Sequence, residues 1–140
     1  MVALAVSGCR STGPNPESAP ASDAFFQREV RPILELNCLA CHNGRTLPGH
    51  LDLTTQATAL AGRVGGRRFL VPRRPDDSLM LTAVSRRGTH PKLMPQRDLS
   101  LSEEDIGTLR EWVEDGAHWP VGANGTLSPR PNPEVPRPDR

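Results

Sequence analysis

The chain has 140 residues, of which 15 are proline and 12 are glycine, and only 36% are hydrophobic. This length allows one domain at most, and the proline-rich ends make the folded part shorter than the chain. The formal net charge of +1 gives no electrostatic reason to expect nucleic acid or a membrane surface as a partner.

Residues 1–22 predict a segment that precedes the folded domain. Small and apolar residues lead to Cys9, and this pattern resembles the lipobox of bacterial lipoproteins, in which the cysteine becomes lipidated. Only eight residues come before Cys9 and none is basic, whereas a signal peptide has a charged start and a longer apolar stretch. Two alternatives stay open: the true start lies upstream, or the likeness is accidental. Residues 10–22 are rich in Pro and Ser and would act as a tether.

The first predicted helix starts near Ser22 or Asp23, its candidate N-caps, and leads the chain to Cys38. Its apolar residues recur at i, i+4, i+7 and i+8, on one helical face: Phe26, Val30, Ile33 and Leu34. Pro32 lies inside this pattern. Because proline has no N–H and its ring clashes with the preceding turn, we expect it to kink or restart the helix.

Residues 38–42 read Cys-Leu-Ala-Cys-His, the C-x-x-C-H signal for attachment of c-type haem. Two thiols on one tight helical turn can each form a thioether to the same porphyrin, and the adjacent His42 can then supply its imidazole to the iron. A thioredoxin-like dithiol would follow a β-strand, and a structural zinc site would need a second ligand pair. Helically spaced residues precede Cys38 and no second pair exists, so the motif favours covalent haem.

Short helices and loops are expected after the motif. A helix from about Thr55 to Ala61, capped by Thr54, would follow a loop at 43–53. A second helix opens at residues 75–77, with an apolar face of Leu79, Met80, Ala83 and Val84. The loop beyond it carries His90, Met94 and Pro95.

The last predicted helix has the clearest limits. Ser100 and Glu103 have the spacing of a capping box, and Gly116 is the expected C-terminal stop. Its apolar positions are Ile106, Leu109, Trp112 and Val113. Residues 122–140 have no packing pattern and are predicted to be disordered, which places the folded domain at 23–121.

Arginine is concentrated between residues 63 and 87. The residues concerned are Arg63, Arg67, Arg68, Arg73, Arg74, Arg86 and Arg87. One interpretation is an ordinary solvated face. The other is a basic patch that pairs with a haem propionate or attracts an acidic redox partner.

This order of elements resembles class I c-type cytochromes, and within them the planctomycete-type cytochrome c domain. The resemblance covers residues 25–120. It is carried by VRPIL before Cys38, CHNG at 41–44, LDL at 51–53, PDDSL at 75–79, LMP at 93–95, LS at 99–100 and WVEDGAHWP at 112–120.

The resemblance implies an all-α fold, in which the N-terminal and C-terminal helices cross around one covalent haem c. It also implies that Met94, 52 residues after His42, is the second axial ligand of the iron. A Met/His pair raises the reduction potential, whereas His90 as the alternative ligand would lower it. Met80 is expected in the core, His50 exposed, and His118 in a surface or capping role.

The function implied is electron transfer by a monohaem cytochrome rather than enzymatic turnover, with redox proteins as partners and no nucleic acid. Such a protein would be periplasmic or otherwise exported, tethered to the membrane if Cys9 is lipidated, and a monomer or a subunit of a redox complex. Two alternatives stay open. One is a haem enzyme or a gas or peroxide sensor with a dissociable Met94. The other is a haem-bearing subunit of a larger oxidoreductase.

Overall fold

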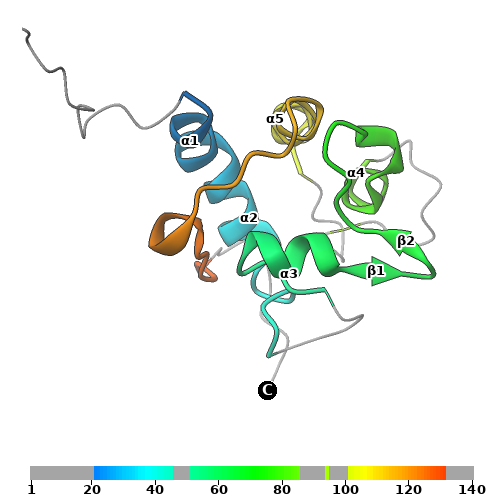
Figure 1. Ribbon diagram of the computed structural model, residues 1–140, viewed down its shortest axis with the longest axis horizontal. Coiled ribbons are helices and arrows are strands. Elements are labelled where there is room, and N and C mark those ends of the chain that lie inside the picture. Colours follow the sequence, from blue (N-terminus) through cyan, green and yellow to red (C-terminus); the bar gives the residue numbers. More distant parts are fainter. Residues whose placement is uncertain (1–20, 46–50, 86–93, 95–100, 132–140) are drawn as a thin grey trace, which may run out of the picture.

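The computed structural model describes residues 21–45, 51–85, 94 and 101–131, and these residues form a mainly helical domain (Figure 1). Its α-helices are α1 (Ala21–Phe25), α2 (Arg31–Asn37), α3 (Gln56–Ala61), α4 (Leu79–Val84) and α5 (Glu103–Glu114). The sequence predicts an all-α domain, but the structure adds a small antiparallel hairpin, β1 (Arg63–Val64) with β2 (Arg67–Arg68).

The hairpin forms because two glycines lie between its strands. Gly65 and Gly66 have φ of +57° and +79°, and positive φ at both central residues is what the tightest hairpin turn requires. Arg63 pairs with Arg68, and Val64 with Arg67. The Gly-Gly pair is therefore the local signal for this turn.

Pro32 interrupts the first helix as expected. Between α1 and α2 the chain makes a π-helical turn, Phe26–Val30, and Pro32 lies in the first turn of α2. At this junction the Arg31 N–H donates to the Phe26 carbonyl, five residues back. The wider turn accommodates Pro32, which has no N–H to donate and whose ring crowds the preceding turn. The chain remains helical through this turn, so α2 still leads into Cys38.

The core lies where this N-terminal helical run packs against α5. Phe26 is fully buried and contacts both tryptophans, with ring centroids 5.9 Å from Trp112 and 5.0 Å from Trp119. Both indoles are also hydrogen-bonded: Trp112 Nε1 donates to the His118 carbonyl and Trp119 Nε1 to the Gly125 carbonyl, each at 2.7 Å. Burial of large rings with satisfied N–H groups joins the two ends of the domain.

Two predicted caps are wrong by one or two residues. Ser102, and not Ser100, is the N-cap of α5, and its hydroxyl accepts the Asp105 N–H at 3.0 Å. Thr55, and not Thr54, caps α3 in a reciprocal pair with Thr58. Thr54 instead bonds to the Asp52 carboxylate. Neighbouring hydroxyl residues compete for a cap, and the backbone turn before the helix selects one of them.

The predicted disorder of the tail is wrong for residues 122–131. A 3₁₀ turn, Gly122–Gly125, follows α5, and the chain then runs along α2 with Leu127 buried. In Figure 1 this segment, drawn in orange to red, lies beside α2 and α3. We call residues 122–131 the strap. It is held by hydrogen bonds to α2 and to the 51–55 region rather than by an apolar period, which is why no pattern signalled it.

Candidate functional site

Residues 38–42 form one tight turn at the end of α2. The Cys38 N–H still donates to the Leu34 carbonyl at 3.0 Å, and Cys38 is the C-cap of the helix. Its carbonyl then accepts from the N–H groups of Cys41, at 3.2 Å, and His42, at 2.9 Å. The motif therefore follows a helix, not the β-strand that a thioredoxin-like dithiol would follow, and it holds the compact conformation that the haem interpretation requires.

Both cysteines of this turn carry free thiols. Cys38 packs against the hydrophobic core, and burial, together with the nearby Cys41, raises the pKa of its thiol to about 12. The thiol is thus neutral at physiological pH. Cys38 and Cys41 are not joined to each other, so both sulfurs are free to form bonds to an exogenous group.

His42 is partly buried, and one of its ring nitrogens is shielded from solvent. Burial lowers the pKa of its imidazole, which the Leu51 backbone partly offsets. Among the described residues the buried Nδ1 has no hydrogen-bond partner. A neutral imidazole is the form that binds a metal ion. A neutral imidazole and two free thiols are the donor set that a c-type haem uses.

The backbone of His42 is fixed from the opposite side of the motif. Its carbonyl accepts the Leu53 N–H at 3.0 Å, and the next residue, Asn43, forms an isolated antiparallel bridge with Asp52. Gly44 makes this approach possible, because its φ is +74° and a Cβ there would lie 2.8 Å from the Asp52 carboxylate. The loop at 51–54 thus holds the exit of the C-x-x-C-H turn.

Met94 is partly buried and packs against the same hydrophobic core as Cys38. Its N–H donates to the Ala83 carbonyl at 2.8 Å, which ties the Met94 loop to α4. Met80 is only 4% exposed within the core, as its helical spacing predicts. The sequence-based choice of Met94 as an iron ligand stays a prediction.

The other candidate ligands divide into two groups. His118 contacts the Asp23 carboxylate at the start of the domain through Nε2, which agrees with the surface or capping role expected for it. His50 and His90 lie outside the described residues, as do Cys9, Pro95, Arg86 and Arg87.

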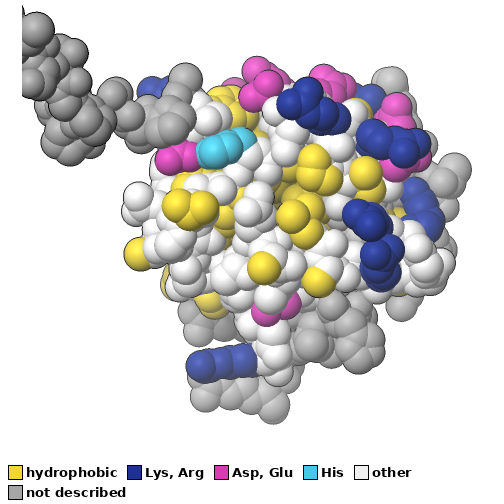
Figure 2. All heavy atoms as spheres, in the orientation of Figure 1, with side chains coloured by type: hydrophobic (Ala, Val, Ile, Leu, Met, Phe, Trp, Pro, Cys, Tyr) yellow, Lys and Arg dark blue, Asp and Glu magenta, His cyan; other side chains and the backbone are white. Residues whose placement is uncertain are grey.

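The described arginines of the 63–87 cluster form an exposed basic surface. The hairpin contributes Arg63, Arg67 and Arg68, and the following turn contributes Arg73 and Arg74. Figure 2 shows dark blue side chains gathered on the side of the molecule that carries the hairpin in Figure 1. An open hollow of about 460 Å³ here is lined by Arg67, Arg68, Val71, Arg74 and Asp77.

Acidic groups balance only part of this surface. Arg74 pairs with Asp77 at 2.5 Å, whereas no ion pair involves the three hairpin arginines among the described residues. Arg63 and Arg68 lie directly opposite each other in the hairpin, an arrangement of like charges that costs stability. We call Arg63, Arg67 and Arg68 the arginine hairpin.

Glu35 was not singled out by the sequence analysis, although it lies one turn before Cys38. It is 1% exposed and forms ion pairs with Arg31 and Arg130. Arg31 and Glu35 have the i, i+4 spacing of a helical ion pair, which is a signal for their contact. Arg130 lies in the strap, and its approach to α2 has no local signature.

No helix in the described part of the chain is both long and apolar enough to cross a membrane. The same residues hold no group of three or more His, Cys, Asp or Glu side chains that could bind a metal ion among themselves.

In a comparison with protein-family models, residues 38–98 match the model described as Planctomycete cytochrome C. The matched segment begins at Cys38 and includes His42 and Met94. No curated protein and no solved structure matches the chain.

Proposed function

Because residues 38–98 belong to the planctomycete cytochrome c family, we propose that this protein is a monohaem electron carrier. Cytochrome c domains bind haem and carry electrons. In this chain we assign thioether attachment to Cys38 and Cys41, and axial ligation of the iron to His42 and Met94. One haem c would be attached to each chain.

The observation that carries the proposal is the turn at 38–42. It presents two free thiols and a partly buried imidazole within one turn, whose N–H groups at Cys41 and His42 donate to the Cys38 carbonyl. This is the donor set that a c-type haem uses. The haem would supply a reversible one-electron change at iron. The protein must hold the haem, provide its ligands and bind the redox partner.

His42 meets the requirement for a stable proximal ligand. Burial lowers its pKa, so the imidazole is already neutral at physiological pH and need not release a proton before it binds the iron. Its Nδ1 has no hydrogen-bond partner among the described residues and is therefore available for an orienting hydrogen bond. A hydrogen bond from Nδ1 to a carbonyl commonly orients a ligating histidine and selects its tautomer.

Met94 is suited to be the second ligand because its thioether is soft and its backbone is tied to α4. With both axial positions filled by protein, no position is open for a substrate. This coordination supports electron transfer rather than enzymatic turnover. The aromatic cluster of Phe26, Trp112 and Trp119 would exclude water from the interior of the domain, which also affects the potential.

We assign the arginine hairpin to the docking of acidic redox partners. Three exposed cations without ion pairs among the described residues, two of them directly opposed, would be stabilised by an anionic protein surface. Encounters of this kind use small interfaces, below about 1,200 Å², and depend strongly on salt. Haem attachment of this type takes place outside the cytoplasm, so the protein would be exported, and lipidation of Cys9 would tether it.

The proposal is tested by expressing the full chain together with cytochrome c maturation proteins. Mass spectrometry of the peptide that contains residues 38–42 should show the mass of one haem, and the visible spectrum should be low-spin. A folded, colourless product without this mass increment would refute haem attachment. A five-coordinate, high-spin spectrum would refute the Met94 assignment while leaving attachment intact.

A further inference from the structure

The strap is bonded to both sides of the C-x-x-C-H turn. On the side before the motif, the Arg130 N–H donates to the Glu35 carbonyl at 3.0 Å, and Glu35 lies three residues before Cys38. On the side after it, the Leu127 N–H donates to the Thr54 carbonyl at 2.8 Å. Thr54 adjoins Leu53, whose N–H binds the His42 carbonyl. One short segment therefore connects the entrance and the exit of the haem-attachment turn.

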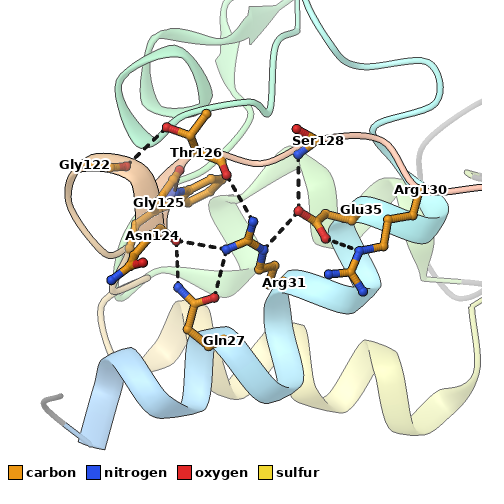
Figure 3. Close-up of polar contacts among 10 residues, drawn as sticks. Gln27, Arg31, Glu35, Gly122, Asn124, Gly125, Thr126, Ser128 and Arg130 are labelled. Carbon is orange, nitrogen blue, oxygen red and sulfur yellow. Dashed lines mark hydrogen bonds and ion pairs between the residues drawn. The ribbon is translucent and has the colours of Figure 1, made fainter. Parts of the chain in front are cut away.

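Glu35 is the centre of the first connection (Figure 3). Its Oε1 accepts from Arg31 Nε at 3.0 Å and from the Ser128 N–H at 3.2 Å. Its Oε2 lies 2.6 Å from Arg130 Nε, as an ion pair rather than an aligned hydrogen bond. A carboxylate that is 1% exposed is retained only where such partners compensate for its lost hydration. Two of these three partners belong to the strap.

Arg31 extends the same contact along the strap. Its guanidinium donates to the carbonyls of Asn124, at 3.3 Å, and Thr126, at 3.2 Å. Gln27 also donates to the Asn124 carbonyl at 2.7 Å. The strap is thus fastened to three successive turns of the helical run that ends at Cys38, and the buried side chain of Leu127 secures its middle.

We infer that Glu35 and the strap position the haem-attachment turn, with Arg130 as the residue that closes the connection. The strap holds the end of α2 and the 51–54 loop at a fixed separation, and Cys38 and His42 are set by those two elements. Glu35 and Arg130 are positioning residues: neither belongs to the proposed donor set, and both act through the backbone on either side of it.

The first test uses the chain without haem and does not depend on the proposed function. Cys38 is alkylated with iodoacetamide in the full-length apoprotein, and peptide mass mapping separates it from the other cysteines. Arg130→Ala should raise the rate at Cys38 by roughly tenfold, the factor that corresponds to leaving one oxygen of the buried Glu35 carboxylate without its ion-pair partner and so easing local opening. Arg130→Lys, which keeps the charge, should restore much of the protection.

Arg110→Ala is the matched control. Arg110 is also a half-exposed arginine, but it lies on α5, and its ion pairs among the described residues are with Asp76 and Glu114 rather than with the strap or α2. In the Arg110→Ala variant, the alkylation rate at Cys38 should equal that of the wild type. An equal rate in Arg130→Ala would overturn the inference.

The second test uses the mature haem protein, and this arm rests on the proposed function. Arg130→Ala and Glu35→Gln should change the reduction potential and weaken the Met–iron charge-transfer band, whereas Arg110→Ala should leave both unchanged. A lower melting temperature with an unchanged potential and band would show a merely structural strap and would overturn the inference. If the Glu35→Gln protein does not fold and accumulate, the reduction potential and Met–iron band of Arg130→Ala decide the test. If the wild type carries no haem, the proposed function fails and the alkylation rates alone decide.

Discussion

Phe26 and Trp112 pack with their rings 5.9 Å apart and tilted by 53°, so the π-helical turn rests directly on α5. Phe26 and Trp112 lie near opposite ends of the domain in the sequence. Their contact closes the fold around the segment that carries Cys38 and His42. Since Trp112 also donates a hydrogen bond to His118, the contact orders the chain just before the strap begins.

We therefore expect Trp112→Ala to be among the most damaging core substitutions. It removes a 2% exposed ring and leaves the His118 carbonyl without its donor. Loss of a buried aromatic side chain costs about 3–5 kcal/mol. Urea unfolding followed by circular dichroism measures the change, with Glu111→Ala on the exposed face of α5 as the control. A loss below about 1 kcal/mol, the range of an ordinary surface substitution, would contradict this packing.

Two glycines should respond in opposite directions to alanine. A Cβ at Gly125 would lie 1.8 Å from the Pro120 carbonyl, so Gly125→Ala must displace the chain that joins α5 to the strap. Overpacking of this kind costs about 1–3 kcal/mol. Gly107 lies within α5 and has nothing within 4 Å of such a Cβ. Gly107→Ala should stabilise the protein by about 0.5–1 kcal/mol, because glycine is a poor helix former.

The same urea titration measures both substitutions. If both substitutions changed the free energy of unfolding in the same direction, the close approach between Gly125 and Pro120 would not be maintained in solution. Opposite signs would confirm that the turn at the start of the strap, Gly122–Gly125, is as tight as its contacts indicate.

The apoprotein should lose stability as the pH falls below about 6.5, the ordinary pKa of histidine. The pKa of His42 is lowered in the folded state by burial. In this window the unfolded chain binds a proton that the folded chain does not, so acid favours unfolding. His42→Gln, which cannot take up this proton, should flatten the dependence. A stability curve between pH 5 and 8 that is identical in both proteins would contradict the burial of His42.

Replacement of Met94 should open the iron without releasing the haem. In the mature protein, Met94→Ala should bind carbon monoxide rapidly when reduced, lose the Met–iron band and have a lower potential, because the soft sulfur ligand is gone. Met80→Leu is the control, since it exchanges a core methionine for a residue of similar volume. Rapid carbon monoxide binding by the wild type would instead support a sensor or enzyme with a dissociable Met94.

The arginine hairpin should govern the salt dependence of electron transfer. Replacement of Arg63, Arg67 and Arg68 by alanine should slow reduction by hexacyanoferrate(II), an anionic probe, at about 10 mM salt. The two proteins should react at similar rates at about 1 M salt, where the screening length is roughly 3 Å. Glu103→Gln with Glu104→Gln, which changes charge elsewhere, is the control. Rates that differ equally at both salt concentrations would argue against electrostatic attraction by this surface.

The local elements could be predicted from the sequence because their causes are local. The C-x-x-C-H turn, the break at Pro32 and the position of α5 depend on residue spacing, on a missing N–H and on a helical apolar period. The expectation that Met80 packs in the core and that His118 has a surface or capping role also followed from such patterns. Helix caps were less certain, since Ser102 and Thr55 each have a neighbouring hydroxyl residue that offers the same chemistry.

The strap and Glu35 were decided only by the tertiary structure. Residues 122–131 have no apolar period, and their order comes from hydrogen bonds with the Arg31 guanidinium and the Glu35 carboxylate, which lie about ninety residues earlier in the chain. A sequence specifies which groups can donate and accept, but not which distant partners folding brings within 3 Å of each other. The C-x-x-C-H turn can therefore be predicted from five consecutive residues, whereas the contacts that hold it depend on residues that only the folded chain brings together.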